Sequence, residues 1–168
     1  MTTPAPGTSR GTSARSLLAT AFRTEPSSLG TAIAAVSVRI VLVWIFVYYG
    51  AGKLFGAFDG PGIHQTSLFM ESTAHLHPGG LFAVVAGVIE LGGALAIGFG
   101  LAARFAAVAL IVDQVMAMVT VTWAHGLSGS INTGYELNLA LVAMALVIVG
   151  IGAGRPSLDA MISRRLRR

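Results

Sequence analysis

Two carboxylates lie at the centres of long apolar segments, where a charge needs a specific reason. Glu90 lies within the apolar run 81–99, and Asp113 lies within 103–124. Each run is long enough to cross the roughly 30 Å hydrocarbon core of a bilayer as a helix. An acid near the bilayer centre costs on the order of 3 kcal/mol, so it normally faces the protein interior. The chemistry open to such groups is proton transfer or the binding of a polar head group.

A third charge and an amide accompany the two acids. Arg39 interrupts the apolar segment 31–52 about eight residues from its inner end, or roughly 12 Å along a helix. This is nearly the depth predicted for Glu90 and Asp113, and Gln114 follows Asp113 directly. We therefore predict a midplane polar cluster of Arg39, Glu90, Asp113 and Gln114. It could fix which helices pack together, exchange a proton between Glu90 and a bound carrier, or line a pathway for ions or solutes.

Helical periodicity indicates which face of each segment carries its acid. Small residues share the face of Glu90 and bulky ones occupy the opposite side, and small residues let helices pack closely. The predicted interior face of 81–99 consists of Ala83, Ala86, Gly87, Glu90, Gly93, Ala94 and Gly98, and its lipid face of Val84, Val88, Leu91, Leu95 and Phe99. The alanine-rich face of 103–124 likewise carries Asp113. Both acids are predicted to point inward.

A second group of polar residues is predicted at the outer ends of the helices. Tyr49 and Lys53 end the first segment, His125 ends the third, and Glu136 begins the fourth. A carboxylate at a helix N-terminus interacts favourably with the helix dipole, and a lysine can extend to lipid head groups. The alternative is that this candidate outer cluster forms an entrance to the midplane cluster.

The expected fold class is all-α, an integral membrane bundle of four transmembrane helices. Apolar periodicity predicts the helices at about 31–52, 81–99, 103–124 and 135–152. The long loop 54–80 is expected to contain a short extracytoplasmic helix, because it mixes apolar with polar side chains. Residues 1–30 lack the apolar core of a signal peptide and are expected to form a disordered cytoplasmic tail. Residues 153–168 form a basic cytoplasmic segment.

Composition excludes several functional classes. Of the 168 residues, 54% are hydrophobic and 11% charged, which is typical of an integral membrane protein. The sequence contains no basic patch interleaved with aromatic residues, so nucleic acid is not an expected partner. The chain has no cysteine, which excludes disulfides, thiolate metal sites and iron–sulfur clusters within it. Only His125 adjoins a transmembrane segment, which argues against a bis-histidine haem, and no metal site is assigned to the histidines of the loop.

The distribution of basic residues predicts the orientation. Four helices place both tails on one side, and basic residues mark the cytoplasmic side. That side collects Arg10, Arg15, Arg23, Arg104, Arg155, Arg164, Arg165, Arg167 and Arg168, whereas the other side has only Lys53. We therefore expect a multi-pass membrane protein with both termini in the cytoplasm.

Seven short strings, in order over roughly 31–160, together resemble the DoxX family of small bacterial four-helix membrane proteins. They are Gly52–Gly56, Phe58–Ile63, Gly87–Leu95, Gly100–Arg104, His125–Gly126, Gly134–Leu139 and Gly154–Asp159, and Arg39 precedes them. Members are associated with quinone-linked sulfur oxidation as a membrane subunit, or with membrane complexes of oxidative-stress defence. The family has no established set of catalytic residues, so the resemblance implies the fold more firmly than an activity.

The leading functional hypothesis is a membrane subunit or anchor of a redox-linked complex that interacts with a quinone. The chain is expected not to be an enzyme on its own, because it has no residue set for electron transfer. Its expected partners are the lipid bilayer and either other subunits or a second copy. Two alternatives stay open: a small proton-coupled transporter or channel, and a structural protein of membrane assembly.

Overall fold

The computed structural model describes residues 28–128, 134–152, 154 and 157–158. Every regular element within these residues is helical, which confirms the all-α class. In chain order the elements are α2 (Ser28–Phe55), the 3₁₀ turn η1 (Ala57–Asp59), α3 (Gly62–Ser72), α4 (Gly79–Phe99), α5 (Ala103–Ala117), the π-helical turn η2 (Met118–Thr122), the 3₁₀ turn η3 (Trp123–His125) and α6 (Glu136–Ile151).

Three of these helices are long and apolar enough to cross a membrane. They are α2 with 28 residues, α4 with 21, and the continuous helical stretch Ala103–His125 with 23. The fourth long helix, α6, is apolar but has only 16 residues. Large apolar side chains cover the outside: Trp44 is 77% exposed and Phe105 is 82% exposed. Such a surface requires lipid contact, so this is a membrane protein.

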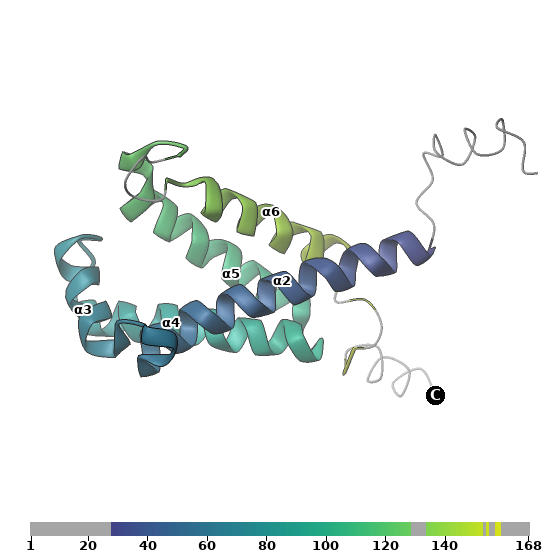
Figure 1. The fold of residues 1–168 in the computed structure, drawn as a ribbon, viewed down its shortest axis with the longest axis horizontal. Coiled ribbons are helices and arrows are strands. Elements are labelled where there is room, and N and C mark those ends of the chain that lie inside the picture. Colours follow the sequence, from purple (N-terminus) through teal and green to yellow (C-terminus); the bar gives the residue numbers. More distant parts are fainter. Residues whose placement is uncertain (1–27, 129–133, 153, 155–156, 159–168) are drawn as a thin grey trace, which may run out of the picture.

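The long helices pack around a shared interior. α2 packs on α4 and α5 packs on α6, while α4 also contacts α5 and α2 contacts α6 (Figure 1). Ten interior side chains, each exposed by 2% or less, form what we call the apolar layer: Leu42, Phe46, Ala94, Ile97, Ala103, Ala107, Leu110, Leu141, Ala145 and Ile148. The predicted interior face of α4 is confirmed where Ala83, Gly87, Glu90, Gly93 and Ala94 are buried.

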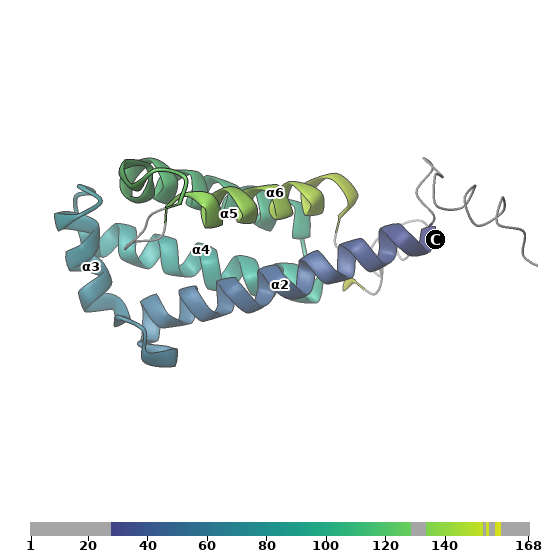
Figure 2. The ribbon, with the colours of Figure 1, turned by 45° about the horizontal axis from the view of Figure 1, so that its top comes forward.

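α2 and α4 run antiparallel and are displaced along their axes. The contacts that fix this register pair Arg39 with Gly98, Gly50 with Leu91, and Leu54 with Gly87. α2 therefore ends near Gly87, about 12 Å by helical rise after α4 has begun at Gly79. At its other end α2 extends beyond the ends of α4, α5 and α6 (Figure 2). Below, the "α3 end" is the end where α4 begins, and the "Arg104 end" is the end where α5 begins.

α3 covers the part of α4 that α2 leaves open. This helix lies in the loop 54–80 and packs on the first turns of α4. The carboxylate of Glu71 in α3 accepts a hydrogen bond of 2.9 Å from the backbone N–H of Gly79. It thereby satisfies one of the free N–H groups at the N-terminus of α4, where negative charge is favourable.

The structure also bears on the predicted tails. Ser28, Leu29 and Gly30 belong to α2 rather than to the predicted tail 1–30. The rest of that tail lies outside the described residues, as does 153–168 apart from Gly154, Ser157 and Leu158.

The α2–α4 contact predicts an asymmetric response to alanine at two glycines. A Cβ on Gly50 would lie 2.5 Å from the backbone N of Leu91, so Gly50→Ala forces the helices apart and should cost about 1–3 kcal/mol of stability. Gly92→Ala, with nothing within 4 Å of its Cβ, is the matched control and should be neutral or slightly stabilising. Denaturant titration of the purified protein in detergent measures both. Equal stability of the two variants would contradict this packing.

Candidate functional site

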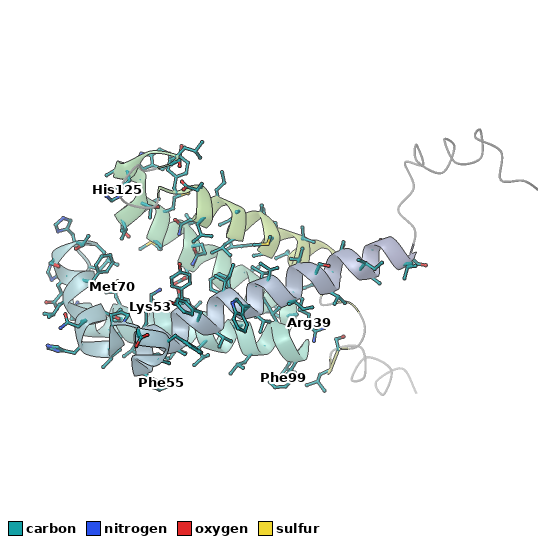
Figure 3. The ribbon with its side chains drawn as sticks, viewed as in Figure 1. Arg39, Lys53, Phe55, Met70, Phe99 and His125 are labelled. Atoms are coloured by element: carbon teal, nitrogen blue, oxygen red, sulfur yellow. The ribbon has the colours of Figure 1, made fainter. Side chains whose placement is uncertain are left out.

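An ion pair between α2 and α4 lies inside the protein. Lys53 Nζ donates a hydrogen bond to Glu90 Oε1. The Glu90 side chain is 3% exposed and that of Lys53 is 25% exposed. Nζ also lies 6.0 Å from the ring centre of Tyr49, within reach of a cation–π interaction. Figure 3 shows Lys53 well separated from Arg39 and Phe99, in the half of the molecule that also contains Met70 and His125.

Asp113 on α5 brings a second acid to this pair. The carboxyl of Asp113 lies near Glu90, and Lys53 acts electrostatically on both acids. Within the described residues, Glu90 Oε2 is buried and receives no hydrogen bond from an N–H or hydroxyl donor. A hydrogen bond between two carboxyls needs a proton on one of them. One lysine therefore faces two acids, and a shared proton would balance the charge.

A chain of hydrogen bonds runs from Asp113 across to α6. Gln114 Nε2 donates to Asp113 Oδ2 at 3.1 Å, and Asn138 Nδ2 donates to Gln114 Oε1 at 2.9 Å. Thr122 Oγ1 then donates to Asn138 Oδ1 at 3.0 Å. We call Asp113, Gln114, Asn138 and Thr122 the polar ladder. It pairs the amide and hydroxyl groups of α5, η2 and α6 with one another inside the bundle.

The π-helical turn η2 positions Thr122 on this ladder. In an unbroken α-helix, eight residues rotate a side chain by about 80° away from the starting face, so Thr122 would turn away from Gln114. A π-turn takes up one extra residue and reduces that offset to about 20°. The sequence prediction of one regular helix over 103–124 did not anticipate this turn.

The structure separates Arg39 from the two acids. Its Nη2 donates to the carbonyl oxygen of Gly98, eight residues and about 12 Å along α4 from Glu90. Gly98 is in the last turn of α4, where carbonyls lack partners within the helix and a cation is favourable. Lys53 thus occupies the place predicted for Arg39, because α2 is displaced towards the Arg104 end.

The predicted outer cluster is also divided. Tyr49 and Lys53 join the acids, whereas His125 and Glu136 are exposed at the α3 end and do not line the cavity around Glu90. In the part of the chain that the structure describes, no three His, Asp or Glu side chains are grouped to hold a metal ion.

Two cavities meet at Lys53. The polar cavity, of about 150 Å³, is lined by Lys53, Glu90 and three polar-ladder residues, Gln114, Asn138 and Thr122, among others. The apolar cavity, of about 410 Å³, lies between α3, α4 and α5 and has Asp113 in its wall. Glu90 therefore faces the polar cavity, Asp113 faces the apolar cavity, and Lys53 lines both.

Sequence reasoning missed two members of this site. Asn138 is an amide inside an apolar segment, and a search for polar side chains that interrupt such segments could have found it. Thr122 gave no usable signal, because threonines are common in apolar helices and the π-turn is not visible in the sequence.

Fold and site together define a small helical membrane protein with a charged cluster enclosed between its helices. The chain belongs to the DoxX family, whose sequence model matches residues 34–123, more than half of the chain. The matched region contains every site residue named above except His125, Glu136 and Asn138. No curated protein and no solved structure matched the chain.

The ion pair predicts strong coupling between Lys53 and Glu90. Lys53→Met leaves a buried acid without its cation and should cost about 3–5 kcal/mol. The same change in a Glu90→Gln background should cost much less, because the glutamine is neutral. Chemical unfolding of the four proteins in detergent gives the coupling energy, and Lys53→Arg, which keeps the charge, is the control. Additive losses would contradict the pair.

Proposed function

We propose that this protein binds a quinone in the apolar cavity and serves as the membrane subunit of a redox-linked complex. The observation that carries the proposal is a cavity of about 410 Å³ that has two charged groups, Lys53 and Asp113, in an otherwise mostly apolar lining. Pockets for small apolar molecules typically have this size and combine apolar walls with a few polar groups that orient the ligand. Phe69 and Leu76, from α3 and its following turn, and Phe82 from α4 contribute apolar wall.

The residues at the end of this cavity suit an apolar ring that carries oxygen acceptors. Lys53 Nζ can donate a hydrogen bond to a ring oxygen, and the carboxyl of Asp113 can hold or accept a proton beside it. A bound quinone supplies two-electron, two-proton redox chemistry. Glu90, adjacent to both Lys53 and Asp113, provides a second carboxyl from which Asp113 can be reprotonated.

Electrons have to come from elsewhere. The sequence has no cysteine for an iron–sulfur cluster or a dithiol. We therefore assign this chain the binding of the carrier and the handling of its protons, and we assign electron delivery to a partner subunit with its own redox group. This division supports the role of a subunit rather than of an enzyme acting alone.

The topology we propose has four membrane crossings, with α6 as the fourth. Its 16 residues span about 24 Å, which a locally thinner bilayer accommodates at modest cost. An even number of crossings places both termini on the Arg104 end, which the basic residues assign to the cytoplasm. α3 then lies on the extracytoplasmic side of the bacterial cytoplasmic membrane.

A proton-coupled transporter is the second candidate, and the polar cavity is the observation in its favour. A transporter needs access to its central site from both sides in turn. The apolar layer occupies the interior between Glu90 and the Arg104 end, which favours the redox subunit. A purely structural role would leave ligand content unchanged in the variants described next.

Quinone binding predicts that the purified protein contains quinone and that replacing Asp113 lowers the amount. Lipid extraction of the purified protein and mass spectrometry should recover quinone at a substantial fraction of one per chain. Asp113→Asn should lower recovery of the reduced carrier about tenfold, because the carboxylate can accept a charge-assisted hydrogen bond from a ring hydroxyl, worth about 1.5–3 kcal/mol. Ala86→Phe, which fills the apolar cavity, should also remove it, and Ala143→Phe on the exposed side of α6 should not. Quinone recovered only at the level of the surrounding lipid would reject the proposal.

The proposed orientation can be tested directly because the chain has no cysteine. Ser72→Cys at the end of α3 and Ala102→Cys beside Arg104 both introduce an exposed thiol. In intact cells a membrane-impermeant maleimide should modify Ser72→Cys, whereas Ala102→Cys should react only after the membrane is opened. The reverse pattern would place the termini outside.

A further inference from the structure

We propose that the polar cavity is a water-accessible half-channel through which Glu90 exchanges protons with the aqueous phase at the α3 end only. The site is thus a one-sided proton port rather than a closed ion pair. The use of those protons by a bound quinone rests on the proposed function, but the access itself does not.

The first argument is the environment of Glu90. Glu90 is buried and lines the polar cavity. Among the described residues, no N–H or hydroxyl group donates a hydrogen bond to its Oε2. A buried carboxylate oxygen without a donor is costly unless water or a proton supplies the missing bond. The cavity has about 150 Å³, and a single water needs about 10–15 Å³ of such space, so the cavity that Glu90 lines has room for several waters.

The second argument is the direction in which the cavity extends. Its lining runs from Glu90 and Leu141, deep in the bundle, to Thr122 and Gly134, next to the connection between η3 and α6 at the α3 end. Gln114, Asn138 and Thr122 contribute polar wall over this distance and are linked to one another by hydrogen bonds. Amides and hydroxyls arranged in this way hold a chain of waters in place, which is what a proton path requires.

The third argument is the seal on the other side. Towards the Arg104 end, the interior is filled by the apolar layer, whose members are exposed by 2% or less. Leu110 packs so closely on α4 that a Cβ on Gly93 would lie 2.9 Å from its Cγ. Beyond this layer, Arg39 and Arg104 add positive charge, which opposes the entry of a proton.

The groups that face Glu90 are consistent with a port that both loads and releases a proton. The charged ones are Lys53 from α2 and Asp113 from α5, while α6 contributes the neutral Asn138 to the cavity wall. Lys53 compensates one negative charge, so the two carboxyls together hold one proton in the neutral state of the site. Loss of that proton through the cavity leaves a net negative charge, which limits the exchange to one proton at a time.

Cysteine accessibility tests the port with two residues one helical turn apart. Leu141 is the member of the apolar layer that also lines the polar cavity, whereas Ala145, one turn further towards the Arg104 end of α6, belongs to the layer and does not line the cavity. A charged, membrane-impermeant methanethiosulfonate reacts with the thiolate form of cysteine. That form requires contact with water, so only a cysteine that water reaches is modified. Leu141→Cys should therefore react about tenfold faster from the α3 side than from the Arg104 side, and Ala145→Cys should stay unmodified from both. Intact cells and inverted vesicles expose the two sides, calibrated with Ser72→Cys and Ala102→Cys.

Each result decides the matter. Equal or faster reaction of Leu141→Cys from the Arg104 side would overturn one-sided access, as would modification of Ala145→Cys. If Leu141→Cys reacts from neither side, water does not enter the cavity and the proposal is overturned. If size-exclusion chromatography shows that Leu141→Cys is misfolded, Leu137→Cys replaces it with the same criteria. Leu137 lines the same cavity, one turn nearer the α3 end of α6. Because labelling needs no quinone, failure of the port is distinguishable from failure of quinone binding.

Discussion

The Lys53–Glu90 ion pair is the interaction that determines how the rest of the site is arranged. An acid in the middle of an apolar helix has to meet a cation or a proton, because the surrounding hydrocarbon offers neither. The cation nearest to the end of α2 reaches the middle of α4 only if α2 is displaced towards the Arg104 end. That displacement exposes the first turns of α4, which α3 then covers. The loop helix, the cavity walls and the position of Arg39 all follow from this offset.

Much of the fold could be predicted from the sequence because it depends on local patterns. The burial of Ala83, Gly87 and Gly93 on α4 follows from small residues at helical spacing, and the family follows from short strings of residues. The axial offset of α2 could not be predicted, because hydropathy marks where a helix can cross a membrane and not how far it slides along its neighbour. The assumption of equal depth therefore paired the acids with Arg39 instead of Lys53.

The polar ladder shows a second limit of sequence reasoning. Asp113 was found because it interrupts an apolar run and Gln114 because it is adjacent to Asp113, whereas Asn138 interrupts an apolar run in the same way as Asp113 and was not found. Thr122 reaches Asn138 only because η2 changes the helical phase between Gln114 and the end of the third crossing. A π-turn has no composition signature in this segment, and its effect depends on which residue it brings round. Tertiary hydrogen bonding therefore decides this part of the site.

The two cavities give the two acids different surroundings, although the acids are neighbours that influence each other electrostatically. Glu90 faces polar walls and Asp113 faces apolar ones, with Lys53 bordering both. If water reaches Glu90 and an apolar carrier reaches Asp113, a proton can pass between the aqueous phase and the carrier although water and carrier occupy different cavities. Keeping water out of the carrier's cavity matters, because desolvation strengthens every electrostatic interaction with the bound ring. Helix packing would need only one carboxyl. Proton transfer needs two, because Glu90 exchanges a proton with water and Asp113 exchanges it with the carrier.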